Sequence, residues 1–375
     1  MMLDANEAAL ATPVCRRLRI RRPIFGFAHS VAAVAAVSKA GGLGVYGATR
    51  DTPDEIRENL RLLRRLAGDA PIGVDLVLPR GMPARNDRAA IEAELPEEHR
   101  AFVAGLAQKY GVPPATKAGM RSRFVRSDEV TAAQIEAVLD SDVDLFACGI
   151  GVPPELVARA KALGKATLAL VGAPRHARQA LAAGVDVLVA QGHDAGAHTG
   201  PIGTFSLVPQ IVDMAGGVPV LAAGGVATGR HLVAALAMGA QGVWMGTAWL
   251  VTEEHNVSPT LLAKLLAAGS DDTVISRADS GKTLRQLRSA WSDEWAAPGA
   301  PRPLGMPQQD ILVGDLLGAI DEHDVKPLVH MPTGQSIAYM TRSTTVRAIM
   351  DGLMMEAVAT LDRLAAARRL PQGAD

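Results

Sequence analysis

Short apolar runs alternate with helix-like segments through most of the chain. The runs are rich in Val, Ile, Leu and Ala, as is typical of strands that are buried on both faces of a parallel sheet. Most are followed by helix start signals, the signature of repeated βα units. Eight such units can close a barrel, so the sequence predicts an α/β fold of the (β/α)8 TIM-barrel class. The predicted strands are Pro23–Phe27, Leu43–Tyr46, Ile72–Leu78, Asp144–Cys148, Ala166–Val171, Val187–Ala190, Pro219–Ala222 and Gly242–Met245.

Helix start signals support this alternation. Thr52, Pro53 and Glu55 provide an N-cap, a proline in the first turn and a capping-box glutamate ahead of an amphipathic segment. Comparable signals predict helices over Pro153–Leu163 and Thr228–Met238. The helix start signals therefore support the same βα repeat that the spacing of the apolar runs predicts.

Two regions do not follow the repeat. Residues 79–126 are rich in Pro, Arg and Glu and contain one predicted helix, Pro96–Tyr110, so we expect an insertion after the third strand that forms a lid or wall. From residue 271 the strand pattern stops, and a final helix is predicted near Val346–Arg369. We therefore predict a barrel domain over 1–270 and an all-helical cap over 271–375.

Composition narrows the class of protein. Of the 375 residues, 48% are hydrophobic and 21% charged, and 38 Lys and Arg nearly balance 39 Asp and Glu, so nothing indicates a nucleic-acid partner. No stretch reaches about 18 consecutive apolar residues, and the first 23 residues do not resemble a secretory signal. Cys15 and Cys148 lack disulfide or metal spacing, which favours a reducing compartment. We expect a cytoplasmic protein without a membrane span.

The segment after the sixth predicted strand, QGHDAGAHTG, carries the strongest candidate chemistry. Its small residues would let a planar ligand approach the backbone, and His198 could abstract a proton near neutral pH. The alternative is a histidine that only stabilises the loop, which is also the more common role of His193 and Asp194. These three residues could also be imagined as metal ligands, but their spacing matches no usual metal motif, so no metal is predicted.

Glycines follow the seventh and eighth predicted strands. Gly224-Gly225 and Gly246 can present bare backbone N–H groups near a helix start, which suits a phosphate. Tight βα turns alone would also explain either loop. The occurrence of both loops at neighbouring strands favours the ligand interpretation.

Three further positions have open interpretations. His29 follows the first strand and could serve in proton transfer, contact a ligand or cap the next helix. Asp75, near the end of the third strand, could anchor a loop. Trp291 and Trp295 are spaced as packing anchors rather than as a stacking platform.

Three ordered segments carry a family resemblance: QGHDAGAHTG, VLAAGGVATGRHLVAALAMGAQGVWMGTAWL and ISRADSGKTLRQLR. Together they resemble the nitronate monooxygenases, also called 2-nitropropane dioxygenases, and the related FMN-dependent enoyl reductases. The resemblance implies noncovalent FMN, with His198 as the base that takes the proton alpha to a nitro group, and with O2 as a co-substrate that yields a carbonyl compound and nitrite. His29 and His193 are the implied substrate-pocket residues. The implied flavin-binding positions are Phe27, Asp75, Gln191, Gly196, Gly224, Gly225, Trp244, Met245, Gly246, Thr247 and Gln335.

The chain departs from the family pattern at three points. The first strand ends in GFAHS where relatives commonly have QAPM, so His29 could alter the pocket. Asp75 stands where relatives often have asparagine, and an ionised carboxylate cannot donate a hydrogen bond. Ala197 replaces the second glycine of the usual AGGH.

Two other functions remain open at this point. One is an NAD(P)H-dependent FMN reductase that acts on an enoyl thioester or a quinone. The other is a non-redox isomerase or aldolase on the same phosphate site, although none of the eight predicted strand ends carries a Schiff-base lysine. Neither the natural substrate nor the oligomeric state follows from the sequence, since the tail would suit a lid or a homodimer surface equally well.

Overall fold

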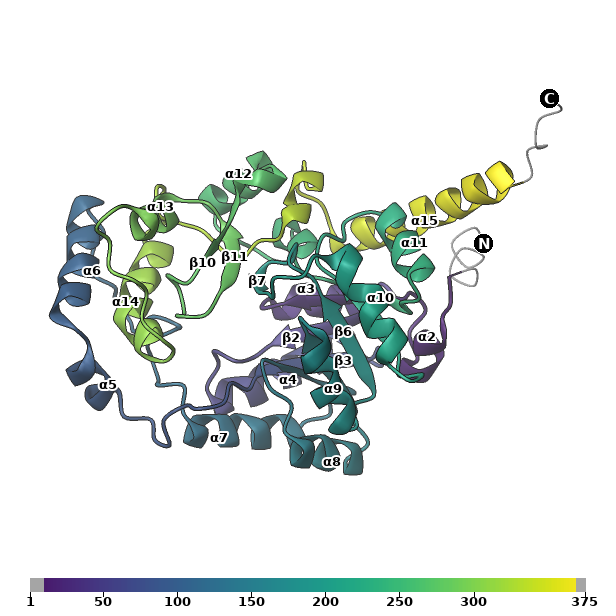
Figure 1. The fold of residues 1–375 in the computed structure, drawn as a ribbon, viewed down its shortest axis with the longest axis horizontal. Helices are drawn as coiled ribbons and strands as arrows, with labels where there is room; N and C mark the ends of the chain where they lie inside the picture. Colours follow the sequence, from purple (N-terminus) through teal and green to yellow (C-terminus); the bar gives the residue numbers. More distant parts are fainter. Residues whose placement is uncertain (1–9, 369–375) are drawn as a thin grey trace.

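A computed structural model describes residues 10–368 of the chain. Its centre is a closed parallel barrel of eight strands in the order β1-β2-β3-β4-β5-β6-β8-β9 (Figure 1). All eight predicted strands are confirmed, with ends shifted by one residue at most. The strands are β1 (Ile24–Ala28), β2 (Leu43–Gly47), β3 (Ile72–Val77), β4 (Leu145–Gly149), β5 (Ala166–Val171), β6 (Val187–Gln191), β8 (Val220–Ala223) and β9 (Gly242–Met245).

The barrel interior is filled by a layer of aliphatic and aromatic side chains. Phe25, Val45, Leu145 and Trp244, from four different strands, belong to one buried cluster. The short helix α2 (Pro13–Leu18) adds Val14, Cys15 and Leu18 to this same cluster. Helix α2 therefore closes the interior of the barrel, a role that its sequence alone did not reveal.

Seven helices form the outer layer of the barrel. The capping residues predicted for α4 form the expected hydrogen bonds. The Thr52 side chain accepts a hydrogen bond from the Glu55 amide, and Glu55 accepts one from the Thr52 amide, so the predicted capping box is confirmed. Apolar faces of these helices pack on the strands in the largest buried cluster. The helices are α3 (Val31–Lys39), α4 (Pro53–Ala67), α7 (Asp128–Leu139), α8 (Pro154–Ala162), α9 (Pro174–Ala182), α10 (Thr204–Met214) and α11 (Gly229–Ala237).

The insertion contains two helices where one was predicted. α5 (Arg88–Glu94) ends at Leu95, and α6 (Glu97–Lys109) begins after Pro96, whose ring disfavours helical geometry in the residue before it. Both helices pack on α14 (Gln308–Glu322) of the C-terminal extension, as Figure 1 shows at its left side. The insertion and the extension thus lie against each other.

The prediction of an all-helical extension is wrong in one respect. Two strands, β10 (Thr273–Ser276) and β11 (Leu284–Leu287), form an antiparallel pair, and β11 also pairs with the short strand β7 (Ala197–His198). This pairing joins segments more than 80 residues apart, so no local pattern announces it. The other elements from residue 247 on are helical: η1 (Thr247–Val251), α12 (Pro259–Ala267), η2 (Ser270–Asp272), α13 (Ala290–Ala296), η3 (Gln335–Tyr339) and α15 (Val346–Arg368).

The long C-terminal helix α15 returns to the barrel wall, where it packs on α3 and α11. A Cβ atom on Gly229, at the start of α11, would lie 2.2 Å from the backbone nitrogen of Ala357, so only glycine permits this crossing. The predicted helix end at Arg369 lies outside the described residues. No helix among residues 10–368 is long and apolar enough to cross a membrane.

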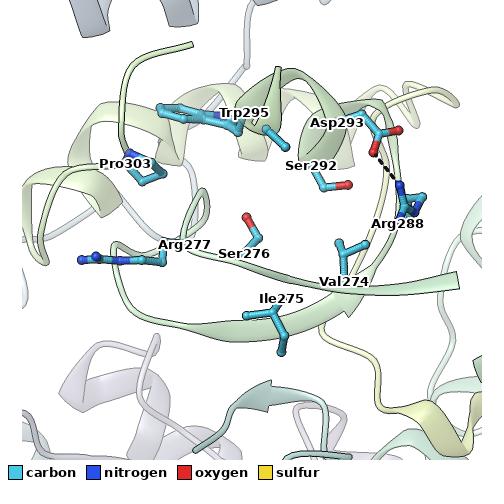
Figure 2. Close-up of a pocket in the computed structure, with 10 residues that line it drawn as sticks. Val274, Ile275, Ser276, Arg277, Arg288, Ser292, Asp293, Trp295 and Pro303 are labelled. Carbon is cyan, nitrogen blue, oxygen red and sulfur yellow. Dashed lines mark hydrogen bonds and ion pairs between the residues drawn. The ribbon is translucent and has the colours of Figure 1, made fainter. Parts of the chain in front are cut away.

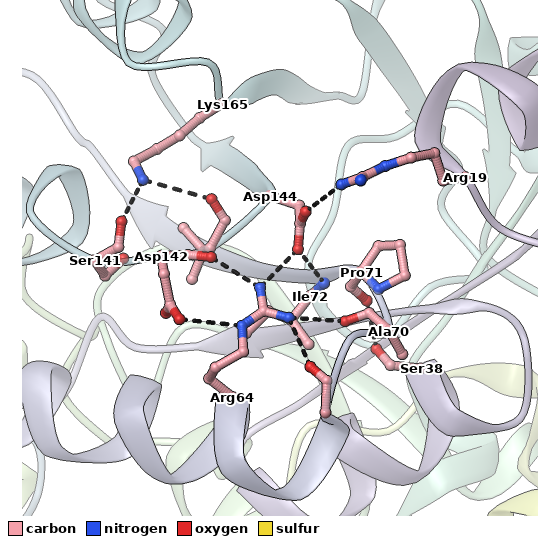
Figure 3. Close-up of polar contacts among 12 residues, drawn as sticks. Arg19, Ser38, Arg64, Ala70, Pro71, Ile72, Ser141, Asp142, Asp144 and Lys165 are labelled. Carbon is pink, nitrogen blue, oxygen red and sulfur yellow. Dashed lines mark hydrogen bonds and ion pairs between the residues drawn. The ribbon is translucent and has the colours of Figure 1, made fainter.

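Arg64 ties the end of α4 to the starts of β3 and β4, at the opposite end of the barrel from the carboxyl ends of its strands (Figure 3). Its guanidinium donates to the carbonyl oxygens of Gly68 and Ala70, each at 3.0 Å, and to that of Asp142 at 2.8 Å. It also donates to the carboxylates of Asp142 at 3.2 Å and Asp144 at 2.8 Å. One side chain therefore satisfies several acceptors at once.

We predict that Arg64→Ala lowers the free energy of unfolding by about 2–3 kcal/mol, because it leaves these charge-assisted hydrogen bonds unmade. Urea denaturation followed by circular dichroism measures the change. Arg65→Ala, at the exposed neighbouring position, is the control and should stay within about 0.5 kcal/mol of the parent. Equal losses in the two variants would contradict the assignment.

Candidate active site

The carboxyl ends of the barrel strands bring the predicted site residues to one end of the fold. Gln191 ends β6, and Met245 ends β9. Phe27 lies in β1, next to the Gly26–Met245 pairing of β1 with β9, and Asp75 in β3 pairs with Gly47 at the end of β2. This is the end of a TIM barrel where catalytic groups gather.

The loop that follows β6 is fixed by its own polar side chains. The Gln191 side-chain amide donates to the carbonyl oxygen of His198 at 3.0 Å, and Nδ1 of His193 lies 2.8 Å from the carbonyl oxygen of Gly200. The carboxylate of Asp194 accepts the Thr204 amide at 2.9 Å, at the first residue of α10. His193 and Asp194 therefore have loop-stabilising contacts, as their common role would suggest.

Gln191, His193 and Asp194 each contact a different backbone group, so their side chains do not converge on one point. Within residues 10–368, no group of three or more His, Cys, Asp or Glu side chains is arranged to hold a metal ion.

His198 sits on β7, where the residue just before strand β11 orients its ring. Nδ1 lies 3.3 Å from the carbonyl oxygen of Thr283. A carbonyl oxygen only accepts, so Nδ1 carries the proton, and Nε2 of the neutral ring keeps its lone pair. Desolvation lowers the pKa of His198 to about 4, and the nearby guanidiniums of Arg121, Arg126 and Arg50 add to the effect, against the opposing contact with Thr283. The ring is therefore a neutral base at pH 7.

Ala197, immediately before the base, has an unusual backbone conformation. Its φ is +61°, in the left-handed region, which costs an ordinary L-residue about 1–2 kcal/mol. It pairs with Arg285 of β11, whose side chain also donates to the carbonyl oxygen of His193 at 3.2 Å. These contacts hold the strained turn in place, so the alanine fits where the family pattern has glycine.

His29 lies beside Phe27 and Gly47 rather than capping α3, whose N-cap is Ser30. Its Nδ1 is 2.7 Å from the carbonyl oxygen of Gly47, and its ring meets that of Phe27 edge to face at 5.3 Å. Desolvation, assisted by Arg50, lowers the pKa of His29 to about 4, although the residue as a whole is exposed. His29 is thus a second neutral imidazole at this end of the barrel.

Asp75 is the most unusual carboxyl group of the barrel. Its side chain is only 5% exposed, and Oδ1 has no hydrogen-bond partner among the described residues. Desolvation raises the pKa of Asp75 to about 7, so the neutral carboxyl is populated at neutral pH. A buried polar atom without a partner is costly, which indicates a place for a ligand atom.

The glycine turn after β8 approaches the loop after β6. Gly224 and Gly225 have φ values of +93° and +75°, and a Cβ on Gly224 would lie 2.9 Å from the Ala195 amide nitrogen. On the other side, a Cβ on Gly196 would lie 2.7 Å from the Gly334 nitrogen. Glycine is therefore required here by both conformation and space.

Residues 334–335 of the extension contact both the turn after β9 and the loop after β6. The Gly334 amide donates to Oγ1 of Thr247, the first residue after the β9 turn, at 2.9 Å. The amide of Gln335 donates to the carbonyl oxygen of Asp194 at 3.0 Å. Gln335 thus reaches the site region through its backbone.

Trp291 and Trp295 are packing residues, as predicted. Both are buried, their rings meet at 5.8 Å, and Trp291 donates to Asp279 at 3.0 Å. Sequence reasoning missed Arg50, Arg121 and Arg126, whose charges act on His198. The available signal was the arginine-rich run 121–126, which is remote in sequence from the histidine.

A separate pocket of about 380 Å³ lies between β10 and α13 (Figure 2). Its walls include Val274, Ser276, Ser292 and Trp295, with an ion pair between Arg288 and Asp293 at its edge. None of the site residues predicted from the sequence lines it. The pocket belongs to the extension and is distinct from the strand ends that carry His198.

Comparison with known proteins settles the family. The sequence matches the profile of nitronate monooxygenases over residues 17–356. The chain belongs to the nitronate monooxygenase family. Membership identifies the protein as an oxidoreductase.

Relatives and solved structures agree with this family. A Mycobacterium tuberculosis protein provisionally named a monooxygenase is 40% identical over 374 residues, covering 95% of this chain and 98% of its own length. A Staphylococcus aureus protein provisionally named a nitronate monooxygenase is 31% identical, covering 81% of this chain and 84% of its own length.

Two solved structures are similar over nearly their whole length. A nitroalkane oxidase of Streptomyces ansochromogenes has a TM-score of 0.78 at 28% identity, covering 92% of this chain and 98% of its own. FabK of Thermotoga maritima has a TM-score of 0.75 at 27% identity, covering 95% of this chain and 99% of its own. The fold of this chain is therefore shared by a protein named nitroalkane oxidase and by one named FabK.

Proposed function

We propose that this family member is an FMN-dependent nitronate monooxygenase that oxidises alkyl nitronates or nitroalkanes with O2 to carbonyl compounds and nitrite. The observation that carries the proposal is the state of His198, a neutral imidazole whose Nδ1 faces the Thr283 carbonyl and whose Nε2 is left to accept a proton. The similarity to a protein named nitroalkane oxidase supports the same chemistry.

The residues present fit FMN. The positive-φ turn at Gly224-Gly225 and the turn at Gly246-Thr247 would hold the phosphate through backbone N–H groups. The unpaired Oδ1 of Asp75 would form a hydrogen bond with a polar atom of the flavin ring system, and Gln191 would lie beside the same ring system. FMN supplies the electron acceptor and the reaction with oxygen, which none of the protein's own side chains can provide.

The protein's own part is to move one proton. Nε2 of His198 would take the proton from the carbon next to the nitro group, while the Thr283 carbonyl keeps the ring in the correct tautomer. The three nearby guanidiniums disfavour the imidazolium form, so the proton would leave readily after each turnover. A nitronate that arrives already deprotonated needs no base.

We predict that His198→Asn lowers turnover of a neutral nitroalkane by about 10²–10⁴-fold, because asparagine cannot accept the proton. Turnover of the preformed nitronate should change far less. Nitrite release measures both rates, and His323→Asn, at an exposed position on the extension, serves as the control. Full nitroalkane turnover by His198→Asn with FMN bound would show that the base is another group.

The pH dependence of the unmodified protein tests the same assignment. Because the pKa of His198 is lowered, its base form persists below the usual histidine range. With FMN kept saturating, nitroalkane turnover should therefore stay level from pH 8 to pH 6 and fall only as the pH approaches about 4. A midpoint near the ordinary histidine pKa of about 6.5 would contradict the structure.

The raised pKa of Asp75 predicts a pH dependence of FMN binding. The neutral carboxyl can donate a hydrogen bond and the ionised one cannot, so FMN affinity should decrease as the pH rises through about 7. In Asp75→Asn, whose amide always donates, this pH dependence should disappear. Fluorescence titration with FMN at pH 6 and pH 8 measures it. An unchanged pH dependence in the variant would exclude Asp75 from the FMN site.

The alternative function is an NAD(P)H-dependent FMN reductase acting on an enoyl thioester or quinone. The structural similarity to FabK supports this alternative. Anaerobic mixing of the FMN-loaded protein, with NADPH in one experiment and with an alkyl nitronate in another, separates the two. We expect the nitronate to bleach the flavin absorbance. Rapid bleaching by NADPH alone would overturn the proposed function.

A further inference from the structure

Arg50, Arg121 and Arg126 come from two segments that the fold joins near His198. Arg50 follows β2, and the other two lie at the end of the insertion. Nε of Arg123 donates to the Arg50 carbonyl oxygen at 3.1 Å, and the Gln134 side chain donates to the carbonyl oxygens on either side of it. These contacts fix the loop after β2 against the insertion, through Arg123, and against α7, through Gln134.

The three guanidiniums differ in their partners. Arg121 pairs with Asp279 at 3.1 Å and lies 3.6 Å from Asp310. Arg50 and Arg126 form no hydrogen bond or ion pair with any other residue in the range 10–368. A guanidinium carries five N–H donors, so two sets of donors have no acceptor within the described chain.

Neither arginine extends freely into solvent. Both side chains are partly buried, and desolvation lowers the pKa of Arg50 to about 9 and also lowers that of Arg126. The carboxylate of Asp310 acts on both charges, and those of Asp279 and Asp321 act on Arg50, in each case without a hydrogen bond to these two arginines. The oxygens of Asp310 accept no hydrogen bond within the described residues. Guanidiniums stay protonated at neutral pH, so the unpaired donors of both arginines are available to an anion.

The same segments contact the proposed base. Asp279, the partner of Arg121, lies four residues before Thr283, whose carbonyl oxygen orients His198. On the barrel side, Arg50 lies three residues after Gly47, whose carbonyl oxygen meets His29. The charges of all three arginines act on His198, and those of Arg50 and Arg121 act on His29 as well, so the cluster lies near the strand ends where the substrate would react.

We propose that Arg50 and Arg126, with Arg121 beside them, form a binding site for an oxyanion group, a carboxylate or a phosphate, that the substrate carries in addition to its reacting carbon. Planar guanidiniums bind such groups through paired hydrogen bonds. The inference deepens the proposed function, because it depends on that function only for the identity of the reacting group.

Anion binding can be measured without turnover. Isothermal calorimetry on the FMN-saturated protein would use malonate as a carboxylate probe and inorganic phosphate as a phosphate probe. We expect at least one of them to bind, and the tighter of the two identifies the anion class. Arg50→Gln and Arg126→Gln should each weaken that binding by about 10-fold or more, because charge-assisted hydrogen bonds are lost.

Kinetics then link the anion site to the reaction. The nitronates of 4-nitrobutyrate and 1-nitrobutane differ only in that a carboxylate replaces a methyl group at the far end of the chain. The arginine variants should therefore raise the KM of the nitronate that carries the carboxylate by about 10-fold and leave that of the 1-nitrobutane nitronate nearly unchanged. If the calorimetry favours phosphate, KM measured with a phosphate-bearing nitronate takes the place of this comparison. Arg65→Gln, at an exposed position on α4, is the matched control and should change neither KM.

The two proposals can fail separately. The glutamine variants remove no partner from another described residue, so they should fold, which thermal denaturation verifies. Anion binding lost in these variants, with no turnover of any nitronate, would support the anion site and reject the proposed function. Absence of binding by both probes, or weaker FMN binding in the variants, would overturn the anion site.

Discussion

The candidate site depends on one close convergence of backbone. The loop after β6, the turn after β9 and residues 334–335 meet so tightly that a side chain on Gly196 would collide with the Gly334 nitrogen. Backbone hydrogen bonds from Gly334 to Thr247 and from Gln335 to Asp194 hold the three segments together. Phosphate binding by bare N–H groups needs this kind of close and preorganised backbone.

The extension also sets the chemistry of the base. Strand β11 pairs with β7, and the carbonyl of Thr283 fixes the tautomer of His198. The strained φ of Ala197 is tolerated because β11 holds the turn on which the histidine sits. The barrel supplies the ligand-facing loops, while the residues after 271 orient the group that would act on the substrate. The extension is therefore part of the proposed catalytic machinery.

The sequence predicted most of the barrel, since each strand is a continuous apolar run and its helices carry local start signals such as the Thr52–Glu55 capping box. It placed the glycine turns and His198 at the strand ends for the same reason. It missed β10 and β11, because their pairing with the His198 loop is a tertiary contact. The role of Gln335 through its backbone and the cluster around Arg50 likewise depend on segments that only the fold brings together. The functional roles of the site residues stay predictions.

The central claim is that the turns after β8 and β9, closed by residues 334–335, bind the phosphate of FMN. Titration of the flavin-free protein with FMN and, in parallel, with riboflavin tests it directly, because the two ligands differ only in that phosphate. The account predicts bound FMN with a perturbed visible spectrum and an affinity at least 100-fold above that of riboflavin, since several charge-assisted hydrogen bonds are at stake. Equal affinities, or no binding of either ligand, would contradict it.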